Sequence, residues 1–165
     1  MAREVLRLIV KLVRQAAELA RSIGIHNLLQ PGLVKEMIIA DILGHELITS
    51  KRHADACDPN DPTILYEYLS CKEGGTGQLD RMFKGPPAKR NESLQRIRRN
   101  KRIYFAVFRE ENQTELKVIY ELDPDVVLQE TERQLNASRN AISHVGFSEA
   151  WAKRNGRVVF PKIET

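Results

Sequence analysis

Two acidic residues, Asp55 and Glu67, lie on either side of a short turn-forming segment and could hold a divalent cation between them. The intervening stretch CDPNDPT is rich in aspartate, asparagine and proline, so the two acids could face each other across a hairpin. Mg²⁺ is usually bound by one or two carboxylates together with water and phosphate oxygens. Such a site could hydrolyse a phosphodiester, because the bound metal activates water and stabilises charge on phosphorus. Acids beside turns are common, so two solvated carboxylates are the alternative interpretation.

The stretch ILYEYLSC reads as a β-strand, and strand alternation places Leu69 on the same face as Glu67 and Lys72 on the opposite face. Glu-x-Lys is a known arrangement in metal-dependent nucleases, but here the position two residues after the glutamate is leucine. Lys72 could take over this role if a bulge shifts the strand by one residue, and its alternative is a solvated lysine at a strand end. Another group, such as Gln78, could support the attacking water. In the third interpretation, the protein binds DNA and cuts it poorly.

A third acid, Glu36, lies within a segment that is apolar almost all round and is predicted to be helical from Leu33 to Leu43. Its neighbours at helical spacing are apolar, so we expect this carboxylate to be partly buried. A buried carboxylate is costly unless it is paired, hydrogen-bonded or bound to a cation. Glu36 is therefore a candidate member of the acidic site, and a structural acid paired to a base such as Lys35 is the alternative.

The remaining pattern predicts one α/β (α+β) domain over residues 1–165, with a central mixed or mostly antiparallel sheet flanked by helices. An amphipathic helix is expected at 4–23, with charged residues on one stripe and a broad apolar face that could pack on the core or on a partner. Further expected elements are a strand at 46–49, a strand at 64–71, a glycine-rich and charged loop at 72–102, a β-hairpin of 103–108 and 116–122, a helix at 124–136 behind an Asp123 cap, a short helix ending at Gly156, and a strand at 157–160.

Positive charge is concentrated between Lys84 and Arg102, although the whole chain has only 26 Lys and Arg against 22 Asp and Glu. Such a cluster suits phosphate contacts on DNA, and a solvated helix face or basic loop is the alternative. Arginine and glutamine also suit the edges of guanine and adenine, and a glycine-rich loop lets the backbone approach a ligand. The candidate DNA-binding residues are Gly75, Thr76, Gln78, Arg81, Lys89, Arg90, Arg96, Arg98, Arg99, Asn140 and His144.

The order of several short motifs resembles that of type II restriction endonucleases of the PD-(D/E)XK superfamily, most closely the small PvuII-type enzymes. The motifs are HADACD, YEYLS, NKRIYFAVF, LKVIYELDPDVV and GFSEAWAKRNG. The resemblance implies a PD-(D/E)XK nuclease fold in which Mg²⁺ is bound by Asp55, Glu67 and the backbone carbonyl of Tyr68. Glu36 matches the acid of the first helix in many members, and Leu69 replaces the usual lysine.

The same resemblance implies double-strand cleavage of a short specific DNA sequence by a homodimer, with residues 1–24 as a candidate dimerisation helix. It also implies a cognate DNA methyltransferase in the same cell. A sequence-specific DNA-binding protein with a degenerate nuclease site, and a junction resolvase of the same superfamily, are the alternative functions.

The composition excludes other classes of site. No apolar run approaches the length of a membrane span, so no membrane association is expected. Cys57 and Cys71 lack CxxC spacing, which predicts reduced thiols in a cytoplasmic protein, and the four histidines form no zinc-binding spacing with them.

Overall fold

The computed structural model describes residues 1–50 and 53–162, and within them the chain forms one α+β domain around a six-stranded mixed sheet. The elements are α1 (Ala2–Ser22), α2 (Leu33–Leu43), β1 (Glu46–Leu47), β2 (Ala56–Cys57), β3 (Leu65–Lys72), β4 (Thr76–Phe83), α3 (Pro87–Arg98), β5 (Asn100–Phe108), β6 (Leu116–Leu122), α4 (Pro124–Ala137), β7 (Ile142–Ser148), α5 (Glu149–Asn155) and β8 (Arg157–Phe160). This architecture confirms the predicted α/β (α+β) class with a mixed central sheet and helices.

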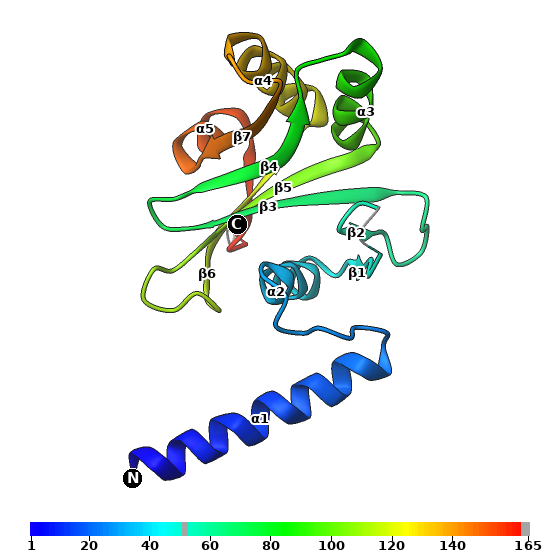
Figure 1. Ribbon diagram of the computed structural model, residues 1–165. Helices are drawn as coiled ribbons and strands as arrows, with labels where there is room; N and C mark the ends of the chain where they lie inside the picture. Colours follow the sequence, from blue (N-terminus) through cyan, green and yellow to red (C-terminus); the bar gives the residue numbers. More distant parts are fainter. Residues whose placement is uncertain (51–52, 163–165) are drawn as a thin grey trace.

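The large sheet has the strand order β1-β2-β3-β5-β6-β8, and β4 pairs with β7 in a separate antiparallel ribbon. β3 and β5 are parallel, whereas β2–β3, β5–β6 and β6–β8 are antiparallel. The ribbon and the helices α3, α4 and α5 lie on one side of the sheet, and α2 lies on the other side (Figure 1). The strand that carries Glu67 is therefore a central strand, covered on both faces.

Two apolar clusters fill the two sides of the sheet, and alternation along β3 supplies both of them. Leu69 and Cys71 face the cluster beneath the ribbon, α3 and α4, whereas Tyr66 and Tyr68 face the cluster beneath α2. Glu67 shares the face of Leu69, as the strand period predicts. This places a carboxylate at the margin of an apolar core.

The prediction of an irregular loop at 72–102 was wrong, because this stretch contains both β4 and α3. The glycines and charged residues of β4 obscure its alternation in the sequence, although Gly77, Leu79 and Met82 are buried and the residues before each of them are exposed. A side chain could not replace Gly77, since an added Cβ would lie 2.9 Å from Phe105 Cε2 and 3.1 Å from Leu69 Cβ. The close approach of β4 to β3 and β5 therefore requires glycine at this point.

Local signals placed the other helix ends correctly. The Asp123 carboxylate accepts a hydrogen bond from Asp125 N–H at 2.9 Å at the start of α4, and the Ser148 hydroxyl accepts one from Trp151 N–H at 3.1 Å at the start of α5. Gly44 ends α2 in the left-handed conformation with a φ of 69°. The predicted β-hairpin is formed by β5 and β6.

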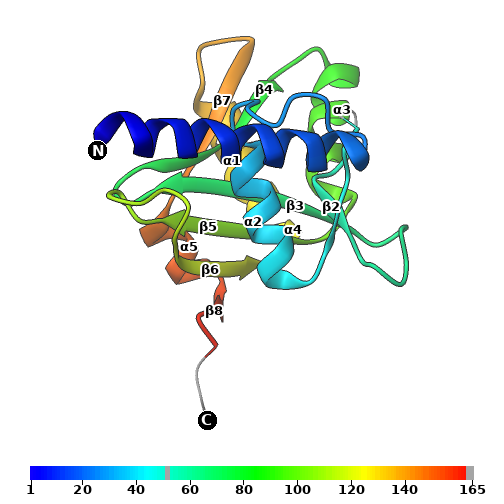
Figure 2. The same ribbon diagram turned by 90° about the horizontal axis from the view of Figure 1, so that it is seen from below.

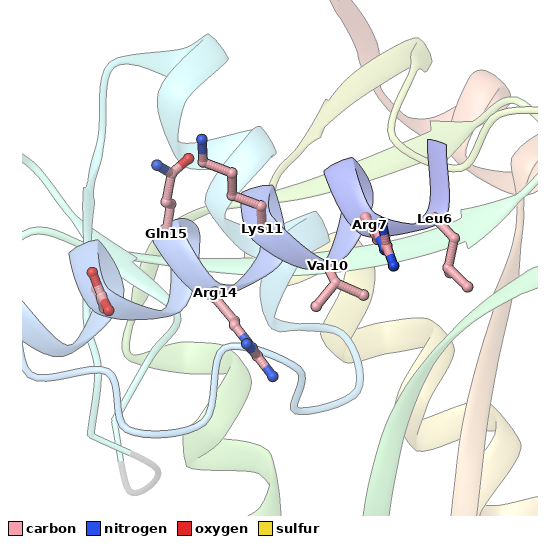
Figure 3. Close-up of a pocket in the computed structure, with 7 residues that line it drawn as sticks. Leu6, Arg7, Val10, Lys11, Arg14 and Gln15 are labelled. Atoms are coloured by element: carbon pink, nitrogen blue, oxygen red, sulfur yellow. The ribbon is translucent and has the colours of Figure 1, made fainter. Parts of the chain in front are cut away.

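Helix α1 extends along the outside of the domain, beyond α2 (Figure 2). Ala20 is its only buried residue, and apolar side chains such as Leu6 and Leu12, 58% and 55% exposed, face solvent. Figure 3 shows an open hollow on this helix, lined by α1 side chains alone. The broad apolar face predicted from the sequence therefore does not pack on the core. In the described part of the chain, no helix combines the length and apolar character needed to cross a membrane.

Candidate acidic site

Asp55 and Glu67 meet at the start of β3, as the predicted hairpin requires. The short antiparallel pairing of β2 with β3 sets the register, with Ala56 opposite Tyr66. Asp55 N–H donates to the Tyr66 carbonyl at 3.1 Å, and the Asp55 carboxylate accepts a hydrogen bond from Tyr68 N–H at 2.7 Å. Asp55 therefore holds the backbone of the strand on both sides of Glu67.

The Glu67 side chain is 13% exposed and forms a 3.7 Å ion pair with the guanidinium of Arg99. Its Oε2 atom is buried and has no hydrogen-bond partner among the described residues. Burial, followed by the negative charge of Asp55, raises the pKa of Glu67 to about 8, while Arg99 and Arg96 oppose the rise. A carboxyl group in these surroundings ionises at a high energetic cost unless further positive charge reaches it.

The pKa values of the two other acids, Asp55 and Glu36, are also raised. Burial raises the pKa of Asp55 to about 6, against the opposing effects of the Tyr68 N–H and the nearby arginines. Burial and the charge of Asp55 raise the pKa of Glu36 to about 7. Glu36 is half-buried, as expected. In the alternative interpretation Glu36 pairs with a base such as Lys35, but the Lys35 ammonium instead donates to Gln113 Oε1 at 3.1 Å. Each of the three acids therefore holds its proton to a higher pH than an ordinary carboxyl group does.

The donor set fits a divalent cation with oxygen ligands. Among the residues that the structure describes, no group of three or more His, Cys, Asp or Glu side chains is arranged to hold a metal. Mg²⁺ needs fewer protein ligands, since water and phosphate complete its shell. The N–H and C=O of one strand residue point to the same side, so the Tyr68 carbonyl faces the edge where its N–H meets Asp55. Asp55, Glu67 and this carbonyl could together bind Mg²⁺, and the buried Oε2 of Glu67 would gain a partner.

Lys72 does not take the place of the missing lysine. The pairing of β3 with β5 continues without a register shift from Tyr66 to Lys72, so the expected bulge is absent from this described strand. Lys72 therefore points to the face opposite Glu67, and it lies roughly 16 Å further along the strand at about 3.3 Å per residue. Its ammonium group bonds Glu110 at 3.1 Å and is half exposed. The structure therefore lacks the bulge on which a catalytic role for Lys72 depended.

Gln78 does not reach the acids either. Gly77 and Leu79 are buried against the sheet, so Gln78, which lies between them on β4, is exposed on the outer face of the ribbon. Leu69, 2% exposed, belongs to the apolar cluster on the side of Glu67. Neither sequence-based substitute for the lysine, Lys72 or Gln78, therefore stands beside Glu67.

A chain of connected hollows runs from Glu36 past the acid pair to the basic surface of α3. One hollow contains Glu36, His53 and Asp55, and a second shares His53 and Asp55. The second hollow continues to Glu67 and to four residues of α3 and its end, Glu92, Gln95, Arg96 and Arg99. A third hollow shares Arg96 and is also lined by Arg81 and Lys89. The acids thus lie at one part of a trough whose other part carries three basic residues, Arg81, Lys89 and Arg96, beside the acids Asp80 and Glu92.

The structure separates the remaining predicted DNA-binding residues into groups. Gln78, Arg81 and His144 are exposed on the β4–β7 ribbon, where His144 Nδ1 lies 2.7 Å from Asp80 Oδ1. Asn140 lines a separate hollow beside His144. Gly75 and Thr76 lie at the far end of β3 and β4 from the acids (Figure 1).

Three of the predicted arginines donate hydrogen bonds within the protein, and one of them, Arg96, donates to the Asp80 carbonyl at 2.8 Å. Arg90 donates to Asn136 Oδ1 at 2.9 Å, and Arg98 donates to Asn91 Oδ1 at 3.3 Å. Neither Arg90 nor Arg98 lines the three connected hollows. Arg96 and Arg99 are therefore the predicted basic residues that the fold brings to the acids.

His53 and Gln95 were missed by the sequence interpretation, although both line the hollow that contains Asp55 and Glu67. Gln95 lies one helical turn before Arg99, so the two share a face at i and i+4 spacing. This spacing could have been recognised if the stretch had been predicted as a helix. His53 is exposed two residues before Asp55, and no spacing in the sequence distinguishes it.

In the absence of divalent cations, the free energy of unfolding is expected to fall as the pH rises from about 4.5 to about 8. Glu67 titrates near 8 in the folded protein, against 4.5 for an ordinary glutamate, so the folded state binds more protons than the unfolded state within this window. Stability decreases with pH wherever the folded state holds the extra proton. Thermal unfolding in EDTA at pH 5 and pH 8 measures the decrease, and Glu67→Gln should make it smaller.

Addition of Mg²⁺ at pH 8 should raise the melting temperature of the unaltered protein and should not raise that of Glu67→Gln to the same extent. The reason is that a cation bound to the folded state alone stabilises it by mass action. An unchanged pH dependence in Glu67→Gln would show that the Glu67 carboxyl is not the titrating group.

Comparison of the chain with known proteins gives no family assignment. No model of a known protein family matches this sequence, and a search of the curated proteins gives no significant match.

Proposed function

We propose that the protein is a Mg²⁺-dependent type II restriction endonuclease that cuts both strands of DNA at a short specific sequence. The meeting of Asp55 and Glu67 at the start of β3, with Oε2 of Glu67 buried and lacking a hydrogen bond among the described residues, carries the proposal. Two carboxylates and a backbone carbonyl are ligands of the type that Mg²⁺ prefers. Arg96 and Arg99 line the same hollow and supply positive charge for a phosphate.

The arrangement of the sheet supports a PD-(D/E)XK nuclease fold. The hairpin of β2 and β3 carries both acids, and β3 is followed through β4 and α3 by the parallel strand β5. Glu36 on α2 adds a third acid close enough to affect the pKa of Glu67. These features agree with the motif order that first suggested the resemblance.

In the proposed reaction, a water oxygen bonds to phosphorus and the bond from phosphorus to one ester oxygen breaks. The attacking water loses a proton to solvent, and the leaving oxygen gains one. Mg²⁺, when bound, polarises the phosphate and lowers the pKa of the attacking water. Asp55 accepts the Tyr68 N–H and so fixes the strand beside Glu67, which keeps the two carboxylates in place. Arg96 and Arg99 attract the phosphate.

DNA would lie across the charged trough and against the β4–β7 ribbon. The outer face of the ribbon presents Gln78, Arg81 and His144, and a two-stranded ribbon can enter the major groove, where each base pair presents a distinct pattern. A homodimer formed through α1 would place two such sites on a palindromic sequence. A cognate DNA methyltransferase would then protect the same sequence in the cell.

A second candidate function is sequence-specific DNA binding with a degenerate nuclease site. The burial of Leu69 at the position of the usual lysine, together with the ion pair of Lys72 to Glu110 on the other face, favours it.

Incubation of the protein with plasmid DNA, in the presence of Mg²⁺ or of EDTA, distinguishes the candidate functions. Discrete fragments only with Mg²⁺ support the endonuclease, and retarded but uncut DNA supports the degenerate protein. Cleavage of branched DNA alone would indicate a junction resolvase.

A further inference from the structure

The acid pair has a cationic partner that does not come from β3. Arg99 follows the last residue of α3 and immediately precedes β5, the strand that lies parallel to β3. Its Nη2 atom lies 3.7 Å from Glu67 Oε2, and its side chain is 28% exposed within the hollow that contains Asp55. The arginine therefore reaches the acids from a neighbouring element and still has access to solvent.

The position of Arg99 is fixed by the fold. The Asn100 side chain, directly after it, donates hydrogen bonds to the Arg96 carbonyl at 2.7 Å and the Ile97 carbonyl at 3.2 Å, which secures the end of α3. Ile97 is 1% exposed in the core beneath the helix. Because the backbone that carries Arg99 is held in place, little free energy is needed to reorient its side chain when negative charge develops beside it.

We propose that Arg99 performs the charge-stabilising role of the missing lysine, pairing with Glu67 in the metal-free protein and holding the attacked phosphate once the carboxylates bind a divalent cation. The inference rests on the proposed function. A guanidinium suits this exchange because its donors match both a carboxylate and a phosphate in a bidentate geometry. Arginine keeps its proton in proteins, so Arg99 stabilises charge and does not act as a general base.

Two opposite effects follow from this double role. In the metal-free protein, the positive charge of Arg99 repels a second cation, so its loss should tighten metal binding. Loss of the same charge also favours binding of a competing proton by Glu67. The binding free energy of a divalent cation improves more than that of the proton, because the cation carries twice the charge. In the loaded protein, loss of Arg99 should weaken phosphate binding and slow cleavage. A residue that merely supports the acids would weaken metal binding instead.

The test compares Arg99→Ala and Arg99→Lys with Arg133→Ala, which removes an exposed arginine of α4 that pairs with Glu130 and lies outside the acid hollow. Mn²⁺ binding without DNA is followed by electron paramagnetic resonance at pH 8. Binding of inorganic phosphate to the Mn²⁺-loaded protein is measured by calorimetry, and single-turnover cleavage of plasmid DNA is measured at saturating Mg²⁺. Thermal unfolding verifies that each variant is folded.

Arg99→Ala should bind Mn²⁺ several-fold more tightly, bind phosphate at least about 10-fold more weakly, and cut DNA about 10²-fold more slowly or worse, as expected for loss of a preorganised charge. Arg99→Lys should recover part of the phosphate binding, and Arg133→Ala should match the unaltered protein. Weaker Mn²⁺ binding in Arg99→Ala, or unchanged phosphate binding, overturns the inference. If the unaltered protein cuts no DNA but its phosphate binding depends on Arg99, the proposed function fails and the phosphate-binding role stands.

Discussion

Asp55→Asn and Glu67→Gln are each expected to lower the rate of Mg²⁺-dependent DNA cleavage by about 10³-fold or more, because each removes one of two charged ligands from the proposed metal site. DNA binding at the basic part of the trough should change much less, since Arg81 and Lys89 line a different hollow. Single-turnover cleavage with Mg²⁺, and duplex binding measured with Ca²⁺ in place of Mg²⁺, separate the two effects.

The amide substitutions are chosen to preserve the structure. The side-chain amide oxygen that Asp55→Asn introduces can still accept the Tyr68 N–H, whereas Asp55→Ala would leave this backbone donor without its partner and cost about 1–3 kcal/mol of stability.

Glu111→Gln, which removes an exposed acid from the turn between β5 and β6, is the matched control and should cut at the normal rate. Near-normal cleavage by Asp55→Asn or Glu67→Gln would show that the altered residue is not a metal ligand.

Leu12→Glu is expected to convert a homodimer into monomers, with the dissociation constant raised about 30-fold or more, as for loss of a central apolar contact. The fold should be unaffected, because Leu12 is 55% exposed and lies outside both apolar clusters. Sedimentation velocity over a range of protein concentrations measures the change. Monomers should also nick plasmid DNA in preference to cutting both strands.

Gln15→Glu is the control for this prediction, since it adds the same charge to α1 at a polar position (Figure 3). It should leave the dimer intact. If the unaltered protein is monomeric at micromolar concentrations, or if Leu12→Glu remains dimeric, α1 is not the dimer contact.

The sequence predicted those parts of the fold in which local chemistry and hydrophobic period agree. As expected, α2 ends at Gly44 and α4 begins directly after its N-cap residue Asp123. Successive side chains of β3 also point alternately into the two apolar clusters. The failures were β4, α3 and β7, where local signals are weak. α3 buries only Ser93, Leu94 and Ile97 and is otherwise polar, so its helical form depends on packing that the sequence pattern does not reveal.

The candidate site was partly predictable for a related reason. Asp55 and Glu67 are joined by a local hairpin, so their meeting follows from turn residues and strand register. Arg99 reaches Glu67 through the parallel pairing of β3 with β5, which are separated along the chain by β4 and α3. No local spacing encodes such a contact, and the sequence therefore suggested only cations that lie near Glu67 along the chain.

The hydrogen bond from Tyr68 N–H to the Asp55 carboxylate gives the protein an internal spectroscopic probe. The resonance frequency of an amide proton depends on the strength of its hydrogen bond, and an ionised acceptor forms a stronger bond than a neutral one. The Tyr68 amide signal in a ¹H–¹⁵N spectrum should therefore follow the ionisation of Asp55 during a pH titration. It should respond again when Mg²⁺ withdraws electron density from that carboxylate, so one backbone signal would report both proton and metal occupancy without any measurement of cleavage.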